Sequence, residues 1–470
     1  MKTLFNKYGI FVLIALFSIV YSFISVIKHN HFQTGLDFGI YVQTFWSYIN
    51  LKLPKVTFYP TYGDLVWSDH FTPSLVLLAP FYYLWPNPNL LLILQSTLFV
   101  IGVYPIFLFC QDKTKNIYFS YVLAFAYLIF FGTQFALTFD FHSATYSAIF
   151  LPWLLYFLFY KRWKLFIVFL LLFIGGKEDA PLIASAIGLF LFFSNHNRRL
   201  GLIVFICSFL YLIVVTKYLM PSMSEFGAKI YTTPEFPKNI FGFLAVTFDS
   251  YTKNKTIFLS LASFIFLPLL SGWFALIPFI HFFTNFISRD FMGRWDIYLH
   301  YRVQLGAILS YASVLGYLKF VNFYHKPQSK KIISYLLPSL FLVCIIAMDY
   351  FLHLPLNTLF KPQFYKTEQW MLDNFHVISK VPNNAYVLTQ NNLAPHLANR
   401  EKLYYFPKNI DQADYILLDM RPGQLIINHW LSGEEKDINT QINQLINNQT
   451  FYVYYRSGDA ILLKKNKQDQ

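Results

Sequence analysis

Long apolar runs fill the first three quarters of the chain. A helix needs about 20 apolar residues to cross the hydrocarbon core of a bilayer, and seven runs fit, within residues 8–27, 89–110, 117–137, 143–160, 200–220, 302–322 and 332–353. Four less regular runs, at residues 165–176, 180–194, 256–271 and 273–288, bring the expected number of crossings to eleven. The pattern predicts a mainly α-helical, polytopic membrane domain over residues 1–353.

Basic residues gather in short loops between these runs, and such loops stay on the cytoplasmic side of a membrane. With eleven crossings and a cytoplasmic N-terminus, four separate loops obey this rule. They hold Lys113 and Lys115; Lys161, Arg162 and Lys164; Arg198 and Arg199; and Lys326, Lys330 and Lys331. We therefore expect a multi-pass protein of the cell membrane, with the first apolar run retained as a signal anchor.

The polar residues 28–73 are predicted to form a long first external loop. Residues 36–50 within it place apolar side chains at helical spacing, which predicts an amphipathic helix lying in the membrane interface. Those side chains are Phe38, Tyr41, Val42, Phe45, Trp46 and Ile49. A second apolar piece, residues 75–85, is short for a crossing and is expected to be re-entrant or interfacial.

The chain changes character after residue 353. The β-rich segments AYVLTQ, ADYILLDM, FYVYYR and AILLKK alternate with helical stretches near residues 363–376 and 434–447. This alternation predicts a small α/β domain over residues 354–470. An odd number of crossings places that domain outside the cell membrane.

Composition agrees with a chain that lies mostly in lipid. Of the 470 residues, 56% are apolar and 21% aromatic, and only 13% are charged, about half the charged share of a soluble domain. Residues 354–470 hold 12 basic and 11 acidic side chains, so nearly all of the net charge of +13 lies in the membrane part. Basic groups that fall mainly in short loops between apolar runs argue against a nucleic-acid-binding face. The three cysteines build neither a disulfide framework nor a zinc site.

Five polar segments interrupt or border the apolar runs. Charged groups at membrane depth are costly, which makes these segments candidates for function, and the predicted topology sends all five to the same outer side. They are GLDFG with Asp37, WSDHF with Asp69 and His70, FDFH with Asp140 and His142, GGKED with Lys177, Glu178 and Asp179, and SRDFMGRWDIYLHYR with Arg289, Asp290, Arg294, Asp296, His300, Tyr301 and Arg302.

The first two segments offer acidic groups in the external loop. Asp37 could act as the general base that deprotonates an acceptor hydroxyl, or it could be a helix N-terminal carboxylate that satisfies free N–H groups and the helix dipole. Asp69 and His70 could ligate a divalent cation or orient a diphosphate. The alternative for this pair is a hydrogen-bonded loop before Pro73.

The next two segments mix acids and bases. Asp140 and His142 share a face if the chain is extended there, and they could bind substrate or pair with each other. The two glycines of GGKED break the chain, and such a break normally lines a cavity. Lys177 could contact phosphate while Glu178 and Asp179 bind sugar hydroxyls, or the three could form an internal ion cluster.

The last segment is rich in arginine. Helical geometry would pair Asp290 with Arg294 and Asp296 with His300, which is the purely structural alternative. Guanidinium groups also suit phosphate oxygens. The candidate substrate-binding residues of this segment are Arg294, His300, Tyr301 and Arg302.

These residues also carry a resemblance to a known family. The blocks GLDFGIYVQTFW, SDHFTPSLVLLAPFYYLWPNPNLLLILQS, FDFHSATYSA, GGKEDAPL, LHYRVQLGAILS and APHLANREKLYYFP follow one another over roughly residues 30–420. Together they resemble a bacterial and archaeal domain-of-unknown-function family of predicted polytopic membrane proteins. The layout of that family is similar to the GT-C class of membrane glycosyltransferases, which act outside the membrane on polyprenyl-phosphate-linked sugars.

The resemblance implies a transferase that passes a sugar from a polyprenyl-phosphate donor, held in membrane lipid, to an extracytoplasmic acceptor. Asp37 would then be the catalytic acidic residue and Asp69 a second carboxylate. No D-x-D or E-x-D pair occurs in the first loop, so a divalent metal cofactor stays an open alternative.

Two other functions fit the same sequence. A transporter or flippase of a lipid-linked intermediate would fit if residues 177–179 line a path open to both sides, although no inverted repeat is evident. The membrane part could also anchor the α/β domain as a binding module, but an anchor does not need eleven crossings. The sequence names neither the sugar nor the acceptor.

Overall fold

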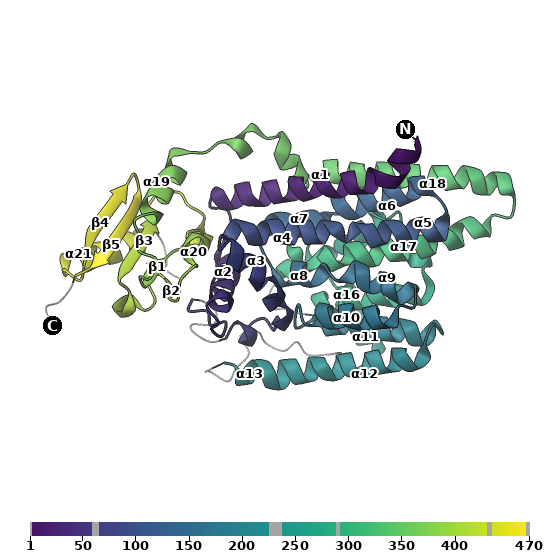
Figure 1. The fold of residues 1–470 in the computed structure, drawn as a ribbon, viewed down its shortest axis with the longest axis horizontal. Coiled ribbons are helices and arrows are strands. Elements are labelled where there is room, and N and C mark those ends of the chain that lie inside the picture. Colours follow the sequence, from purple (N-terminus) through teal and green to yellow (C-terminus); the bar gives the residue numbers. More distant parts are fainter. Residues whose placement is uncertain (1, 59–64, 225–236, 288–291, 430–434, 467–470) are drawn as a thin grey trace.

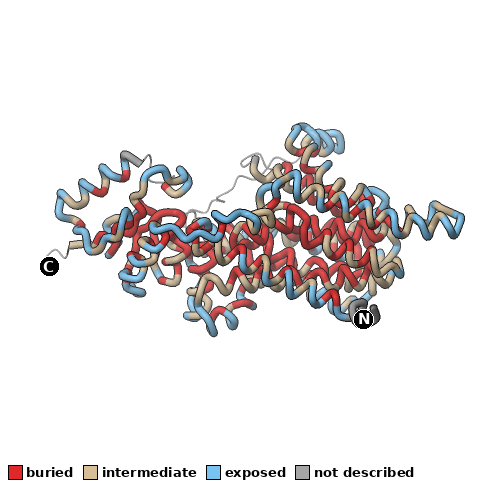
Figure 2. Tube along the Cα trace, turned by 90° about the horizontal axis from the view of Figure 1, so that it is seen from above, coloured by how far each residue is buried: buried red, intermediate tan, exposed pale blue. Residues whose placement is uncertain are grey.

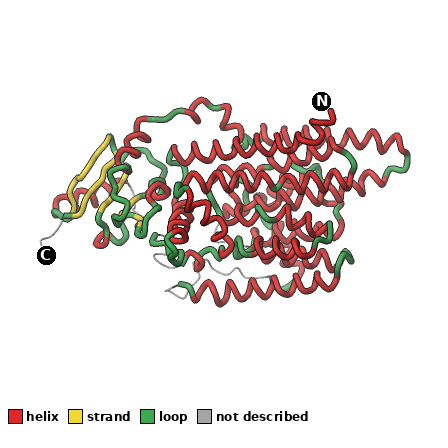
Figure 3. The backbone as a smooth tube through the Cα atoms, viewed as in Figure 1, coloured by secondary structure: helices red, strands yellow, loops and turns green. Residues whose placement is uncertain are grey.

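A layer of long helices runs side by side along the molecule, with a small sheet at one end and the N-terminus at the other (Figure 1). The computed structural model describes residues 2–58, 65–224, 237–287, 292–429 and 435–466. Buried residues concentrate along the middle of the helical bundle and beneath the sheet (Figure 2). The strands are confined to the end that holds the C-terminus (Figure 3).

The bundle contains helices at all eleven places where the sequence predicts a crossing. The bounds are α1 (Lys2–Asn30), α4 (Pro88–Ile101), α5 (Val103–Thr114), α6 (Ile117–Ile129), α7 (Phe131–Phe139), α8 (Ser143–Ala148), α9 (Leu151–Phe159), α10 (Trp163–Ile174), α11 (Ala180–Phe193), α12 (Arg198–Val214), α13 (Met220–Ser222), α14 (Ile240–Phe248), α15 (Tyr251–Ala262), α16 (Leu276–Phe286), α17 (Val303–Phe323) and α18 (Pro327–Phe351).

Not all of these helices are long enough to cross a membrane alone. Within the described residues five are long and apolar enough, and the α6–α7 pair, bent by 43°, makes a sixth candidate. The others, such as α10 and α11, are shorter apolar helices. The mainly helical, polytopic fold is therefore confirmed, whereas the number of eleven crossings stays a prediction.

Local sequence explains where several helices begin. The side chains of Asn87, Asn116 and Asn197 accept hydrogen bonds from backbone N–H groups in the first turns of α4, α6 and α12, at 2.9–3.1 Å. An asparagine cap of this kind stabilises a helix by about 1 kcal/mol. Two of the three, Asn116 and Asn197, lie in loops that the basic residues mark.

Helices in the centre and at the edge of the bundle differ in burial. The apolar stretch that contains α17 is 78% buried, whereas that of α18 is 17% buried and that of α12 is 22% buried. Inside the bundle, hydroxyls bond across helices: Tyr21 donates to the Leu128 carbonyl at 2.5 Å and Tyr311 to the Pro152 carbonyl at 2.8 Å. Such bonds satisfy polar groups that have no water to bind. The outer faces of α12 and α18 are suited to lipid.

The four basic loops lie at the end of the bundle away from the sheet, here called the basic end (Figure 1). Contacts agree with this placement, because Lys115 and Lys330 line one cavity and the rings of Phe159 and His196 lie 6.1 Å apart. The second contact joins the end of α9 to the loop after α11. The two runs predicted at residues 165–176 and 180–194 are therefore two helices that turn back on each other.

The first loop contains helix α2 (Leu36–Ile49) and, after a 3₁₀ turn at Pro73–Leu78, helix α3 (Ala79–Leu84). The helix at α2 was predicted correctly, whereas its placement in the membrane interface stays a prediction. Residues on all sides of α2 are buried, and the Gln43 amide donates to the carbonyls of Arg400 and Glu401 at 3.3 and 3.0 Å. Protein covers this helix because the chain after residue 353 packs on it. The turn and α3 expose apolar side chains, namely Val76, Leu77, Phe81, Tyr83 and Leu84.

The C-terminal part forms the predicted α/β structure. Its elements are α19 (Gln369–Ile378), β1 (Val387–Thr389), α20 (Ala394–Leu397), β2 (Leu403–Tyr405), β3 (Tyr415–Asp419), α21 (Glu435–Asn447), β4 (Phe451–Ser457) and β5 (Ala460–Lys465). The sheet has the order β2-β1-β3-β5-β4, with β1 parallel to β2 and β3, and β5 antiparallel to β3 and β4. The short edge strand β2 was not predicted. Helix α19 begins later than predicted, after a 3₁₀ turn at Pro362–Tyr365.

Candidate functional site

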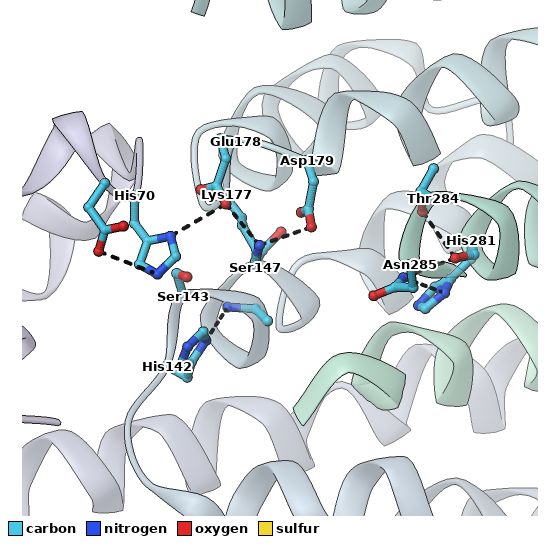
Figure 4. Close-up of polar contacts among 12 residues, drawn as sticks. His70, His142, Ser143, Ser147, Lys177, Glu178, Asp179, His281, Thr284 and Asn285 are labelled. Carbon is cyan, nitrogen blue, oxygen red and sulfur yellow. Dashed lines mark hydrogen bonds and ion pairs between the residues drawn. The ribbon is translucent and has the colours of Figure 1, made fainter. Parts of the chain in front are cut away.

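The described parts of all five polar segments meet at the end of the bundle next to the sheet, here called the polar end. His70 Nδ1 lies 3.4 Å from Glu178 Oε1, and the His70 and His142 rings are 5.7 Å apart. The His142 ring stacks on the His300 ring with centroids 3.5 Å apart. Figure 4 shows His70, His142 and the Lys177 group turned toward one another. The shared side predicted for these segments is therefore confirmed in the geometry.

Asp37 lies in the first turn of α2 and is exposed, whereas most of that helix is buried. The start of the helix is capped from another part of the chain, because the Leu36 N–H donates to Asn391 Oδ1 at 2.6 Å. Among the described residues, no helix N–H donates to the Asp37 carboxylate. Asp37 is the acidic residue of the first turn, where a carboxylate interacts favourably with the helix dipole, so the helix-terminal alternative stays beside the general base.

The surroundings of Asp37 favour a basic carboxylate. Although Asp37 is exposed, the protein atoms around its carboxyl group displace water from it and so raise its pKa, and the nearby His70 charge lowers the pKa by less. Asp69, Asp140 and Tyr301 also interact with it electrostatically. A carboxylate with a raised pKa accepts a proton from a hydroxyl more readily than an ordinary aspartate does.

Asp69 and His70 form a different arrangement from the one the sequence suggested. Asp69 is 2% exposed, and its Oδ2 lies 3.8 Å from His70 Nε2. Burial lowers the pKa of His70, but the Asp69 and Glu178 carboxylates outweigh it and raise the pKa to about 9. His70 is therefore an imidazolium between two carboxylates. A hydrogen-bonded loop before Pro73 does not by itself account for the contacts of His70 with Asp69 and Glu178.

A divalent metal does not fit these residues well. A histidine must be neutral to bind a metal. Each ring nitrogen of His70 instead faces a carboxylate, which favours the protonated ring. Across the described ranges, no three His, Cys, Asp or Glu side chains are grouped so that they could hold a metal ion.

The GGKED turn carries an ion cluster between α10 and α11. Lys177 Nζ lies 3.0 Å from Glu178 Oε1 and 2.9 Å from Asp179 Oδ2 (Figure 4). A side chain at Gly176 would place its Cβ 2.9 Å from the Ser147 backbone, so only glycine lets this turn lie on α8. The internal ion cluster is thus present. It reaches solvent, since the Asp179 side chain is 45% exposed while that of Lys177 is 7% exposed.

The FDFH segment is extended and is clamped by α4. Gln95 donates its amide to the Asp140 carbonyl at 2.8 Å and accepts from the His142 N–H at 2.9 Å. His142 Nδ1 accepts from the Ala144 N–H at 3.3 Å and so caps α8. The alternative of an Asp140–His142 ion pair is wrong, because Asp140 interacts electrostatically with Lys28 and Asp37 instead.

The arginine-rich segment does not form an α-helix in its described part. Short 3₁₀ turns at Met292–Trp295 and His300–Arg302 flank irregular chain, so Asp296 and His300 are not placed side by side. Asp296 Oδ1 instead accepts from the Ile297 N–H at 2.7 Å, and His300 stacks on His142. The Asp296–His300 pairing is therefore wrong. Arg289 and Asp290, and with them the Asp290–Arg294 pairing, lie outside the described residues.

Two arginines of this segment have different surroundings. Arg302 is fully buried, donates to the Arg294 carbonyl and lies over the Phe286 ring, 5.3 Å from its centroid. Its backbone packs against Gly132, where an added Cβ would lie 2.5 Å from the Arg302 carbonyl oxygen. Arg294 lies over the Tyr301 ring at 5.5 Å and interacts electrostatically with Glu178 and Asp179.

Several residues of the site were missed in the sequence. Gln95 carried a signal, because it is a polar side chain within the apolar run of α4. Tyr41, whose hydroxyl accepts from the Ser143 N–H at 3.1 Å, was assigned only to an apolar face. Asn391 carried no signal, since it lies in the C-terminal part and acts through a contact 355 residues away in sequence.

Comparisons with known proteins address the fold and the family. A family model described as "Predicted membrane protein (DUF2079)" matches residues 28–463, so the chain belongs to this family. No curated protein matches the chain. Among solved structures, ArnT from Cupriavidus metallidurans in the apo state is similar, with a TM-score of 0.54 and 11% identity over 97% of this chain and 98% of the ArnT chain. At this identity the match shows the fold alone, and it confirms the GT-C-like layout.

Proposed function

We propose that this DUF2079 protein is a membrane glycosyltransferase that passes a sugar from a polyprenyl-phosphate donor to an extracytoplasmic acceptor. One observation supports it most: five segments, far apart in sequence, gather acidic and basic groups around an exposed carboxylate at one end of an apolar bundle. Burying charges is costly unless they are paired and used.

The proposed reaction assigns a role to each part of the polar end. The acceptor hydroxyl oxygen attacks the anomeric carbon, the bond from that carbon to the phosphate oxygen breaks, and polyprenyl phosphate leaves with the electron pair. Asp37 takes the hydroxyl proton. Asp69, the second carboxylate, holds the His70 imidazole in place, with its Oδ2 3.8 Å from His70 Nε2.

The phosphate of the donor needs cationic partners. Arg294 and Lys177 are the proposed ones, with His70 beside them, because guanidinium and ammonium groups bind phosphate oxygens well. Lys177 already has two carboxylate partners, so Arg294 is the stronger candidate. His142, His300, Tyr301 and Arg302 are proposed to shape the pocket around the donor, and Asp140, Glu178 and Asp179 to balance charge and bind sugar hydroxyls.

The membrane arrangement is part of the proposal. The basic end faces the cytoplasm under the basic-loop rule, and the polar end with the domain of residues 354–470 faces outward from the cell membrane. The apolar side chains exposed on α3 and on the outer face of α12 would then contact lipid and the polyprenyl chain. Residues 1–353 would form the membrane domain.

The experiment is a donor screen with the purified full chain in lipid. Polyprenyl-phosphate sugars that differ in the sugar are supplied with a crude envelope acceptor, and release of polyprenyl phosphate is measured. Release with at least one donor supports the proposal. No release with any donor, together with movement of a labelled lipid-linked sugar between leaflets of a vesicle, would favour a transporter or flippase instead.

A further inference from the structure

A cavity, here called the lysine groove, lies between the C-terminal end of α2 and the β2 edge of the sheet. Its volume is about 800 Å³, within the range of ligand sites. One wall comes from residues 46–57 of the first loop and the other from residues 401–412 around β2. The proposed reaction does not use this groove.

Hydrogen bonds fix the two walls to each other. The Gln43 amide donates to the Glu401 carbonyl at 3.0 Å. The Thr57 hydroxyl donates to the Leu403 carbonyl at 2.7 Å and accepts from the Leu403 N–H at 2.9 Å. These bonds tie a loop of the membrane part to the edge strand. The groove is therefore formed before a ligand arrives, which lowers the entropic cost of binding.

The charge of the groove favours an anion. Four lysines and one glutamate line it, and the single glutamate, Glu401, pairs with Lys52 at 2.9 Å. Lys402 lies over the Tyr386 ring at 4.3 Å. Lys55 and Lys408 are exposed, and neither forms an ion pair within the described part of the chain. Two cationic groups are thus available to a ligand on opposite walls.

The remaining lining favours a saccharide over a simple ion. Trp46 and Tyr404 contribute aromatic rings, and Asn409 and Gln412 contribute amides. The Tyr404 hydroxyl donates to Gln412 Oε1 at 2.9 Å, which orients that amide and leaves its N–H groups for a ligand. Sugar rings pack their C–H faces on aromatic rings and bond amides through hydroxyls. The aromatic rings, amides and lysines of the groove together are suited to bind an acidic oligosaccharide.

The position of the groove relates it to Asp37. Trp46 is nine residues after Asp37 on the same helix, which is about 14 Å along the helix axis.

We propose that the lysine groove binds an acidic oligosaccharide, bearing carboxylate or phosphate groups, that serves as the acceptor. The role of this oligosaccharide as acceptor rests on the proposed transferase function. Its binding to the groove does not depend on that function, so binding and transfer can be tested separately.

The test measures binding to the purified full chain in detergent by calorimetry. The probes are hexagalacturonate, an oligomer of glycerol phosphate and neutral maltohexaose. We expect at least one acidic probe to bind, with an affinity that falls as salt increases, and maltohexaose to bind more weakly. The double variant Lys55→Glu/Lys408→Glu should weaken acidic binding about tenfold or more.

A matched control is Lys361→Glu/Lys380→Glu, which reverses two exposed lysines of the C-terminal part outside the groove. It should leave binding unchanged, and thermal unfolding of both double variants checks that they fold. Preference for the carboxylate or the phosphate probe identifies the acid. Equal loss in the control, equal binding of maltohexaose, or no binding by any probe would overturn the assignment.

The outcome is separable from that of the transferase proposal. Asp37→Asn should keep acidic saccharide binding even if it stops turnover. If donor release fails while the groove still binds, only the function is wrong. If donor release depends on Asp37 and reversal of the groove lysines changes neither binding nor turnover, only the groove assignment is wrong.

Discussion

Charged side chains gather at both ends of the bundle, but they are exposed at the basic end and largely buried at the polar end. At the basic end, Lys113 and Lys115 pair with Asp112, and the three side chains are 38–76% exposed. At the polar end, the side chains of Lys177 and His70 are only 7% and 15% exposed and contact carboxylates. Exposed pairs contribute little to stability, whereas buried charges are costly to place and costly to unpair. The basic end thus holds exposed charges that would set the proposed orientation in the membrane, and the polar end holds buried charges for the proposed chemistry.

The same substitution at the two ends should separate them most strongly. Asp37→Asn keeps the size of the side chain but removes its basicity, so turnover of a lipid-linked sugar should fall about 10²- to 10⁴-fold. Asp112→Asn at the basic end should leave turnover unchanged. Rates are measured with the donor identified by the screen, and thermal unfolding in detergent is compared for both variants. Normal turnover in a stable Asp37→Asn protein would exclude Asp37 as the base.

Stability should respond to a buried lysine and not to an exposed one. Lys177→Met leaves Asp179 without its ion-pair partner and Glu178 with His70 alone, which should lower the free energy of unfolding by about 3 to 5 kcal/mol. Lys113→Met should cost at most about 1 kcal/mol, because its pair with Asp112 is exposed. Denaturant titration in detergent measures both. Equal effects would mean that the two ends do not differ in burial as described.

A smaller effect is expected from pH. The pKa of His70 is raised to about 9 by Asp69 and Glu178 in spite of burial, above its usual value near 6.5. The stability that His70 contributes is therefore fully present below about pH 6.5 and is lost as the pH rises through about 9. The unfolding temperature should fall across this window, and His70→Gln should flatten the fall. An identical slope in the variant would contradict the ion contacts of His70.

Much of this architecture could be predicted from the sequence because it depends on local pattern. The apolar runs gave the helices of the bundle, and four of the five strands lie in segments with β-rich patterns. The shared side of the polar segments also followed, since the charge of the loops sets which helix ends lie together. The short strand β2 was missed because three residues carry too little pattern.

Errors arose where contacts distant in sequence override local pattern. The apolar spacing of α2 suggested a helix with one exposed polar face, but the C-terminal part covers it and caps its first N–H through Asn391. The i, i+4 spacing of Asp296 and His300 suggested a helical pair, but the chain turns and His300 stacks on His142 instead. Neither contact could be predicted from the residues next to it in sequence.

The reactivity of one cysteine at the polar end tests the central claim most directly. In a protein without Cys110, Cys207 and Cys344, Asp179→Cys and Lys330→Cys are treated in intact cells with a membrane-impermeant thiol reagent, with and without polyprenyl phosphate. We predict that Asp179→Cys reacts from outside, that polyprenyl phosphate slows its reaction, and that Lys330→Cys does not react. Reaction of Lys330→Cys alone, or a rate at Asp179→Cys that polyprenyl phosphate leaves unchanged, would contradict an outward-facing site for a lipid-linked sugar.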